Sequence, residues 1–280
     1  MHMKRMALTL IQFAIVGSIL LACNMGTKGL FSKRTEREKY EDRIEKIETP
    51  EVLAWKRLGN KVLAQPLKIP APYAEKGIFT GDSTDANAFL FTALPGQKIK
   101  VMLTPEPGSL YTAFLELWDA ADAGNPRLIE AADTMLNSLE FSAPQGGHFI
   151  VRMQPKLAAQ GSYHLKISLQ PILGFPVSPA VKSNIGSLWG DPRDAGVRKH
   201  EGIDIFAKKG SPAIAVSDGM VGRVSEGGIG GKVVWFNPDK ERFSVYYAHL
   251  DSQYVQSGER VKKGTVLGTV GNTGNAKLTP

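Results

Sequence analysis

The sequence has 280 residues, enough for two modest domains, and its 42% hydrophobic and 22% charged residues exclude a disordered chain. The 29 glycines and 17 prolines favour many turns and short strands over a helical bundle. A single cysteine, Cys23, excludes a disulfide framework and a zinc site built on several thiolates. The net charge of +7 suits an anionic polymer or surface, but it does not distinguish nucleic acid, acidic lipid and cell wall.

The first 23 residues have the organisation of an export signal. Two basic residues precede an apolar run over 7–21, which is too short to span a bilayer comfortably. The run ends in "LLAC" at 20–23, which resembles the lipobox of bacterial lipoproteins. The resemblance implies a signal peptide over 1–22 and acylation of the Cys23 thiol. A plain secretory signal or a short membrane anchor is the alternative.

The residues after the lipobox indicate where an exported chain would stay. Asn24 follows Cys23, and in the Gram-negative lipoproteins that the sequence resembles this choice favours outer-membrane sorting. Residues 23–34 are rich in Gly, Lys, Ser and Thr and predict a flexible tether. We therefore expect a lipid-anchored protein of the bacterial cell envelope, at the outer membrane and facing the periplasm.

A helical segment is expected over 35–65. Thr35 begins a capping-box signature, and Thr49 followed by Pro50 predicts the N-cap and first turn of a second helix. Trp55 belongs to an apolar stripe along this second helix. The stripe predicts that the helix packs on a neighbouring domain, with Trp55 in the packed surface.

The composition then changes to that of an all-β sandwich over 70–171. Six short runs rich in β-forming residues are separated by Gly, Pro, Asp and Asn at intervals of about ten residues. The segments "AFLFTALPGQKIKVML" and "GSYHLKISL" resemble the bacterial pre-peptidase C-terminal domain, a β-sandwich attached to secreted peptidases that carries no catalytic residues. His148 and His164 fall in these runs, and we expect ordinary strand residues there. The runs are Phe89–Phe91, Lys98–Leu103, Phe114–Trp118, Leu139–Phe141, His148–Met153 and Tyr163–Leu169.

A second β-rich region over 172–280 contains a histidine and a carboxylate four residues apart, His200 and Asp204. A helix would bring such a pair together directly, but Gly202 and the β-branched Ile203 disfavour one. In a straight strand the two side chains would stand about 13 Å apart. Chelation of a metal by this pair therefore requires a bend, which Gly202 permits. The spacing alone is weak evidence for a metal site.

The surrounding sequence adds a resemblance. "SLWGDPRDAGVRKHEGIDIFAKKGSPAIAVSDGMVGRV", "YYAHL" and "SGERVKKGTVLGTVGNTGNA" resemble the lysostaphin/LytM-type metallopeptidases in order and spacing. The resemblance implies an antiparallel β-sheet peptidase domain in which His200 and Asp204 are zinc ligands. It also implies that His249 stands beside the metal as a catalytic residue that stabilises the reacting water or oxyanion. Zinc in such a site lowers the pKa of its bound water to roughly 7.

One part of the family pattern is not met. The family closes its site with His-x-His, whose second histidine is the third zinc ligand, just after the segment that corresponds to "GNTGNAKLTP". The sequence has no histidine beyond His249, so we expect the domain to be C-terminally truncated in this reading of the chain. Gly219, Gly258, Gly264 and Gly271 lie between β-runs and predict turns with positive φ.

Three functions are compatible with these observations. The first is a zinc-dependent endopeptidase that hydrolyses peptide crosslinks of peptidoglycan. The second is a non-catalytic LytM-like regulator that binds a cell-wall amidase or other division proteins, and the third is a structural lipoprotein that binds the wall through its sandwich. Nucleic acid is not expected as a partner, because the basic residues lack interleaved aromatics and the chain carries an export signal. The glycine-rich segment 227–232 lacks the features of a phosphate loop and predicts a turn.

Overall fold

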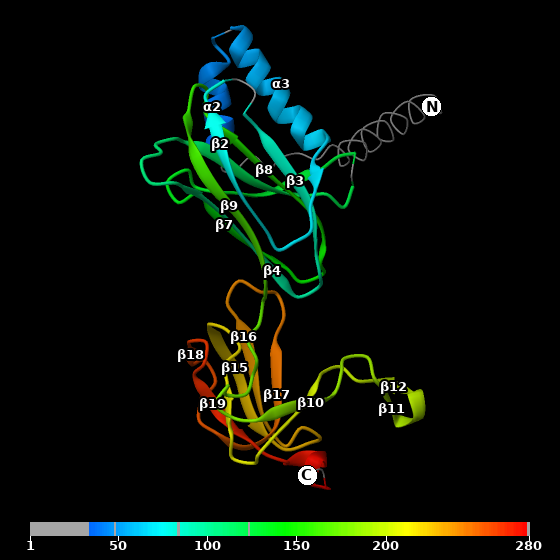
Figure 1. Ribbon diagram of the computed structural model, residues 1–280. Helices are drawn as coiled ribbons and strands as arrows, with labels where there is room; N and C mark the ends of the chain where they lie inside the picture. The colour runs from blue at the N-terminus through cyan, green and yellow to red at the C-terminus, as the bar shows by residue number, and fades with distance from the viewer. Residues whose placement is uncertain (1–33, 48, 83–84, 123, 279–280) are drawn as a thin grey trace, which may run out of the picture.

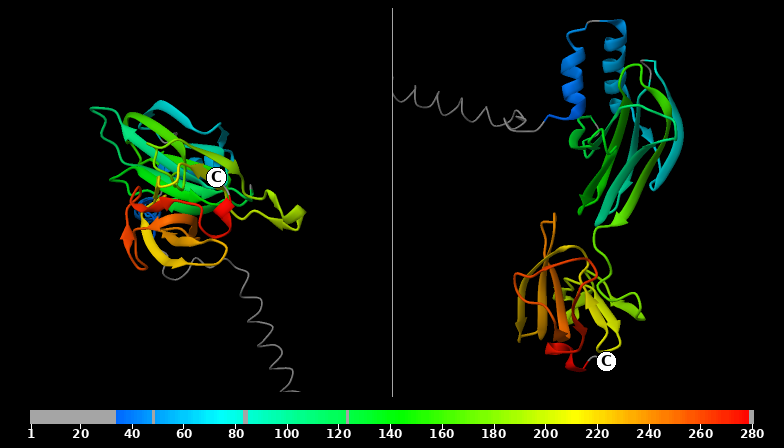
Figure 2. Two further views of the ribbon diagram at one scale, coloured as in Figure 1. Left: turned by 90° about the horizontal axis from the view of Figure 1, so that it is seen from below. Right: turned by 90° about the vertical axis from the view of Figure 1, so that its left-hand side faces the viewer.

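The computed structural model describes residues 34–47, 49–82, 85–122 and 124–278 (Figure 1). These residues form a helical hairpin and a β-sandwich in one lobe, and a second β-sheet lobe that follows it along the chain (Figures 1 and 2). The prediction of a mainly β protein with an N-terminal helical segment is confirmed. Within the described residues, no helix has both the length and the apolar character needed to cross a membrane. The predicted lipobox and Cys23 lie outside the described residues.

Both helices begin at the predicted caps. The first helix, α2 (Glu36–Ile44), starts after Thr35, whose hydroxyl accepts from the Glu38 backbone while the Glu38 carboxylate accepts from the Thr35 backbone. In the second helix, α3 (Pro50–Ala64), the Val52 amide of the first turn donates to the Thr49 hydroxyl at 3.4 Å. Local side-chain chemistry therefore sets where each helix starts.

The sandwich consists of a five-stranded sheet, in the order β1-β3-β8-β5-β6, and a four-stranded sheet, in the order β2-β9-β4-β7. All pairings are antiparallel except that of β1 with β3. The predicted runs all lie in strands, whereas β1, β2 and β6 were missed. The strands are β1 (Leu67–Lys68), β2 (Tyr73–Thr80), β3 (Asn87–Ala93), β4 (Gln97–Pro105), β5 (Ala113–Asp119), β6 (Arg127–Ala131), β7 (Ser138–Ala143), β8 (Gly147–Pro155) and β9 (Gln160–Pro171).

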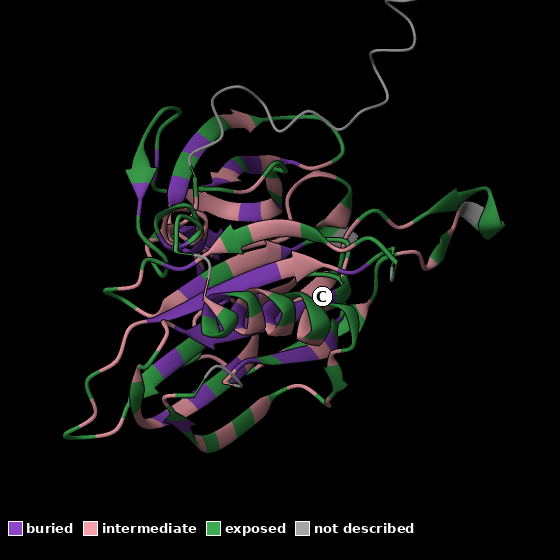
Figure 3. Ribbon diagram, turned by 90° about the horizontal axis from the view of Figure 1, so that it is seen from above, coloured by how far each residue is buried: buried purple, intermediate pink, exposed green. Residues whose placement is uncertain are grey.

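Alternate residues of these strands form the core between the two sheets. Buried and exposed positions alternate along several strands, as the stripes in Figure 3 show. Each fully buried Leu, Ile or Phe side chain contributes about 1.5–3 kcal/mol of transfer free energy. The largest buried side chains of this core are Phe79, Phe91, Ile99, Leu103, Leu115, Leu117, Met153, Leu165 and Ile167.

Helix α3 packs on the outer face of the five-stranded sheet through Trp55, as predicted for its apolar stripe. Trp55 is only 1% exposed, and its indole nitrogen donates to the carbonyl of Pro155 on β8 at 2.8 Å. The rings of Tyr40 and Phe114 lie 5.4 and 6.1 Å from its ring centre, and the Arg37 guanidinium lies 4.4 Å from it. These contacts attach the helical hairpin to the sandwich.

The second lobe is built on a six-stranded sheet in the order β14-β19-β17-β16-β15-β18. Its core contains Val221, Val234, Phe236 and Leu267, none of which is exposed. A short sheet of β10 and β13 and a hairpin of β11 and β12 stand beside it. The elements are β10 (Ser183–Ser187), β11 (Pro192–Arg193), η2 (Asp194–Gly196), β12 (Arg198–Lys199), β13 (Asp204–Ala207), β14 (Pro212–Ile214), β15 (Gly219–Glu226), β16 (Lys232–Pro238), β17 (Val245–Gln253), β18 (Arg260–Val261), β19 (Val266–Val270) and η3 (Gly274–Leu278).

The glycines of this lobe correct one sequence interpretation. Gly258 and Gly264 have φ of 88° and 86°, as predicted for turns. Gly219 and Gly271 do not take positive φ, so the prediction was wrong for them. Instead, an added Cβ would lie 2.3 Å from a backbone oxygen at Gly219 and 2.3 Å from a backbone nitrogen at Gly271. Close approach of a neighbouring strand, rather than turn geometry, requires glycine at these two positions.

Candidate metal centre and active site

The structure brings His200 and Asp204 together. A bend at Gly202 separates them, and the His200 Nε2 atom lies 3.4 Å from the Asp204 Oδ1 atom instead of the distance of a straight strand. Two ligand atoms at 2.0–2.1 Å from a tetrahedral zinc ion stand about 3.3 Å apart. The pair therefore fits two adjacent positions of such an ion, and its nitrogen and oxygen donors suit zinc.

The atoms of this pair that face away from each other are held by neighbouring groups. Asp204 Oδ2 accepts hydrogen bonds from Ser187 Oγ at 2.6 Å and from Arg193 Nη2 at 2.5 Å. His200 Nδ1 lies 3.2 Å from the carbonyl oxygen of Leu188. Burial raises the pKa of Asp204, but the hydrogen bonds from Ser187 and Arg193 and the nearby positive charges outweigh burial. The net pKa lies below the ordinary value, so the carboxylate is ionised at neutral pH.

His200 belongs to an arm of the second lobe, and Asp204 begins strand β13 at the end of that arm. Residues 188–203 extend from the sheet between β10 and β13, with the β11–β12 hairpin at the far end (Figures 1 and 2). Two backbone hydrogen bonds close the base of the arm, from Gly190 to the His200 carbonyl and from His200 to the Asp191 carbonyl, each 2.8 Å long. The indole of Trp189 is 72% exposed beside this base. Of the candidate metal pair, the Asp204 side chain is 41% exposed and the His200 side chain 17% exposed.

His249 comes from strand β17 of the large sheet and has an unusual backbone. Its φ is 59°, in the left-handed region that non-glycine residues rarely occupy. A register shift between β16 and β17 accompanies it, and the His249 amide donates to the Gly230 carbonyl at 2.8 Å. The Nδ1 atom lies 2.8 Å from the Thr273 carbonyl, so Nδ1 carries a proton and Nε2 keeps its lone pair.

Two loops fix His249 in this position. The glycine-rich turn between β15 and β16 supplies the Gly230 carbonyl, and the residues before η3 supply Thr273. The loops are joined to each other, because the Asn275 amide donates to the Ile229 carbonyl at 3.0 Å. The turn predicted at 227–232 is thus part of the support for His249. Sequence reasoning did not identify Thr273, whose role depends on a carbonyl oxygen that any residue carries.

The remaining histidines of the described chain lie on the sandwich. His148 lies 3.0 Å from the Thr92 hydroxyl, and His164 Nε2 lies 2.5 Å from Glu106 Oε1. The carboxylate partner of His164 was not expected, because Glu106 is 58 residues away in the sequence. Among the residues that the structure describes, no group of three or more His, Cys, Asp or Glu side chains could hold a metal ion. Within the described residues, the candidate metal site therefore consists of the pair His200 and Asp204.

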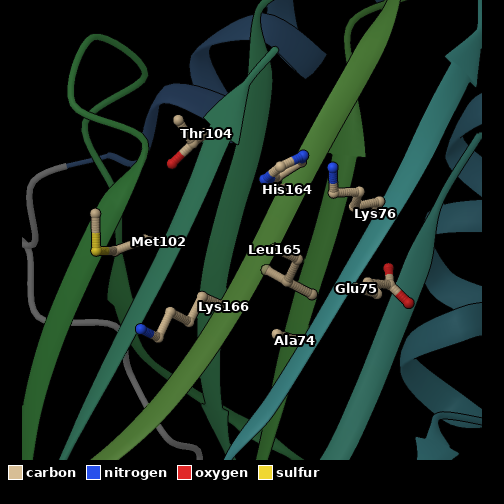
Figure 4. A pocket seen from close by; sticks show the side chains of 8 residues that line it. All are labelled: Ala74, Glu75, Lys76, Met102, Thr104, His164, Leu165 and Lys166. Carbon is tan, nitrogen blue, oxygen red and sulfur yellow. The ribbon is translucent and has the colours of Figure 1, made fainter.

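A groove on the sandwich has a volume of about 420 Å³. It lies over the outer face of β2, β9 and β4, as Figure 4 shows. Lys76 and His164 at its edge are both paired with Glu106. Their hydrogen bonds lower the pKa of the Glu106 carboxyl, and the hydrogen bond from His164 has the larger effect. The groove brings together no metal ligands, and the candidate chemistry lies in the other lobe.

Comparison with known proteins finds a family that is similar to the C-terminal region. Residues 198–280 match the model of Peptidase family M23, and the match includes His200, Asp204 and His249. The peptidoglycan DD-endopeptidase ShyC of Vibrio cholerae is 34% identical over 94 residues, which are 34% of this chain and 22% of ShyC. The L-Ala--D-Glu endopeptidase of Bacillus subtilis is 33% identical over 103 residues, which are 36% of this chain and 31% of that protein.

The chain thus spans less than a third of either curated relative. The resemblance of its C-terminal region to the lysostaphin/LytM-type peptidases is confirmed by the family match. For the sandwich, the pre-peptidase C-terminal domain of a Bacillus anthracis collagenase gives a TM-score of 0.32 at 16% identity, over 37% of this chain and 95% of that domain. A score this low carries no conclusion about the sandwich.

Proposed function

We propose that the C-terminal lobe is a zinc-dependent endopeptidase that hydrolyses peptide crosslinks of peptidoglycan. The observation that carries this proposal is the 3.4 Å approach of His200 Nε2 to Asp204 Oδ1 inside the segment that matches Peptidase family M23. The names of the two relatives support peptidoglycan as the substrate class. Because those names specify different bonds, the proposal does not extend to the bond that is cut.

Each of the three residues has a separate task in this proposal. His200 and Asp204 hold the metal, which when bound lowers the pKa of a water molecule and polarises the scissile carbonyl. The Nε2 lone pair of His249 accepts a hydrogen bond from the reacting water, because Nδ1 is engaged by the Thr273 carbonyl. A catalytic zinc site usually has three protein ligands, so the proposal requires one more ligand from outside the described residues.

Zinc content and hydrolysis, measured on the same variants, test this assignment. In the full-length protein, His200→Ala and Asp204→Ala should each remove bound zinc and the cleavage of purified peptidoglycan. His249→Ala should keep its zinc but reduce turnover ~100-fold or more. Equal zinc loss in His249→Ala and His200→Ala would reverse the roles. A zinc-loaded protein that does not hydrolyse peptidoglycan but activates a cell-wall amidase would favour the regulator instead.

We further propose that the protein acts at the cell envelope as a lipoprotein anchored through Cys23. The lipobox resemblance of residues 20–23 supports this location. An acyl anchor combined with a positive net charge supplies two membrane signals, which is what stable attachment requires. A peptidase held in this way has access to the wall polymer from a fixed surface.

A further inference from the structure

One guanidinium nitrogen lies at the centre of the network around the candidate metal pair. Arg193, on β11 in the arm, places its Nη2 atom 2.5 Å from Asp204 Oδ2 and 2.7 Å from Ser187 Oγ. The same Nη2 atom lies 3.0 Å from His200 Nδ1. The Arg193 side chain is half-buried, with 34% of its surface exposed. A single nitrogen therefore reaches both candidate ligand side chains.

The atoms that Arg193 contacts are the ones that would face away from a metal. It approaches Oδ2 of Asp204 and Nδ1 of His200, whereas Oδ1 and Nε2 face each other at 3.4 Å. We propose that Arg193 is a positioning residue that holds Asp204 against His200 in the geometry required for zinc. This inference rests on the proposed function and adds to it a residue that acts through the two ligands.

Counting hydrogens shows how the network prepares His200. The Nη2 atom carries two hydrogens, and the Asp204 carboxylate and the Ser187 hydroxyl use both. The Ser187 hydroxyl in turn donates a hydrogen bond to Asp204 Oδ2 at 2.6 Å. His200 Nδ1 is left to donate to the Leu188 carbonyl at 3.2 Å, and Nε2 keeps the lone pair that zinc needs. Ligating histidines commonly donate their second nitrogen to a backbone carbonyl in this manner.

The direction of the change in zinc affinity on substituting Arg193 distinguishes a positioning role from a purely electrostatic effect of its charge. A cation beside a zinc site repels the metal, so electrostatics alone predicts that removing the Arg193 charge tightens zinc binding. Positioning predicts the opposite, because Asp204 loses the group that orients its Oδ2 atom. Loss of such an outer contact typically weakens metal affinity by about 10–100-fold. Arginine suits the task because its planar fork reaches several acceptors at once, which lysine cannot do.

The experiment compares Zn²⁺ dissociation constants of the full-length protein, measured by competition with a chromophoric chelator. Arg193→Met should bind Zn²⁺ about 10–100-fold more weakly than wild type, with Arg193→Lys in between. Lys199→Met is the matched control, since it removes the same charge from an exposed residue of the same arm, next to His200. Its affinity should equal that of wild type or be slightly higher.

A second variant guards against local misfolding in Arg193→Met. Ser187→Ala removes one hydrogen bond to Asp204 and leaves the Arg193 contact, so it should weaken Zn²⁺ binding less than Arg193→Met. Thermal unfolding of the metal-free variants should match wild type. Unchanged or tighter Zn²⁺ binding in Arg193→Met overturns the inference alone. Absence of Zn²⁺ binding by the wild-type protein overturns the proposed metal dependence as well.

Discussion

His249 occupies a backbone conformation that is unfavourable for any residue with a Cβ atom. The bulge on β17 and the hydrogen bonds to Gly230 and Thr273 hold it there. Strained residues of this kind are concentrated at functional sites, where the surrounding structure compensates for the strain. The strain at His249 therefore supports its proposed role, because packing alone would be satisfied without it.

The strain can be measured with two substitutions at the same position. Because glycine adopts positive φ freely, His249→Gly should be more stable than His249→Ala by about 1 kcal/mol. At the adjacent Ala248, which does not take positive φ, a change to glycine should instead lower stability by about 0.5–1 kcal/mol. Chemical denaturation of the three variants tests both signs. A His249→Gly variant that is less stable than His249→Ala would contradict the presence of strain.

Asp218 provides a pH-dependent prediction in the same lobe. The Lys263 backbone amide donates to its carboxylate at 2.9 Å and the Lys262 ammonium donates at 2.9 Å, and these groups hold the pKa of Asp218 below its ordinary value. A carboxyl whose pKa is lowered in the folded state stabilises the fold at pH values above its ordinary pKa of about 4. This contribution disappears as pH falls through the folded-state pKa. Asp218→Asn should therefore lower the melting temperature at pH 7 and leave it unchanged at pH 2. An equal effect at both pH values would exclude the charge as the cause.

Sequence reasoning located part of the site and missed the rest for a physical reason. The resemblance to the lysostaphin/LytM-type peptidases predicted that His200 and Asp204 act together, Gly202 permits the bend that this requires, and the pair does meet. Arg193 and Ser187 act through contacts that exist only once the arm folds back on β10. Neither residue type has a spacing rule that marks it as a supporting group, so the sequence alone could not single them out.

At the scale of whole elements, a buried polar network joins α3 to the sandwich. Arg152 on β8 pairs with Glu116 on β5 at 2.5 Å, and its guanidinium also donates to the Gly59 carbonyl of α3 at 3.0 Å. Both side chains of the pair are at most 5% exposed. Arg37 of α2 is buried close by and donates to Gln154 of β8. Removing Glu116 would leave the Arg152 charge buried without its ion-pair partner.

The corresponding prediction is a large loss of stability in the sandwich. Glu116→Ala should cost about 3–5 kcal/mol, because breaking a buried pair leaves an uncompensated charge. Glu140→Ala is the control, since Glu140 pairs with Lys100 at 3.0 Å on the exposed face of the four-stranded sheet. That change should cost less than about 1 kcal/mol. Urea unfolding of both variants gives the comparison, and similar losses in the two would contradict the network.

The strands that sequence reasoning missed have charged outer faces. Strand β2 reads YAEKGIFT and is exposed at alternate positions, including Ala74 and Lys76, so its apolar face is too short to appear as a β-forming run. Strand β6 is a five-residue edge strand, RLIEA, with a charged residue at its first and fourth positions. The central strand β8 has a long buried run, and β4 has buried residues at alternate positions, so both contain a recognisable β-forming pattern. Burial of a strand therefore decided whether it could be predicted.

At the scale of the whole molecule, each of the two lobes has its own hydrophobic core. A short segment between β9 and β10 connects the lobes. A hydrogen bond from the Ser142 hydroxyl to the Glu241 carboxylate, 2.7 Å long, lies between them. Because zinc is expected to bind only the folded C-terminal lobe, it should raise the melting temperature of that lobe and leave that of the sandwich unchanged. At a free zinc concentration 100 times the dissociation constant, the gain is about 2.7 kcal/mol. Calorimetry with zinc and with a chelator tests this, and a shift of both transitions would mean that the lobes unfold together.

The position of Cys23 leads to a prediction for the intact chain. A Cys23→Ser variant should lose the acyl anchor and move from the membrane fraction to the soluble fraction, because a basic surface alone is a weak membrane signal. Fractionation followed by mass spectrometry of the mature N-terminus provides the measurement. An unmodified wild-type N-terminus, or equal partitioning of the two proteins, would rule out lipidation at this cysteine.

The strand order of the C-terminal lobe also sets a sequence of events during synthesis. Strand β14 pairs with β19, which is the last strand of the sheet in the chain, so the sheet cannot close until β19 has left the ribosome. His249 follows Asp204 by 45 residues. At about 5–20 residues per second, the candidate metal pair emerges roughly 2–9 s before His249. Both parts of the candidate site have therefore left the ribosome before β19 can complete the sheet that carries His249.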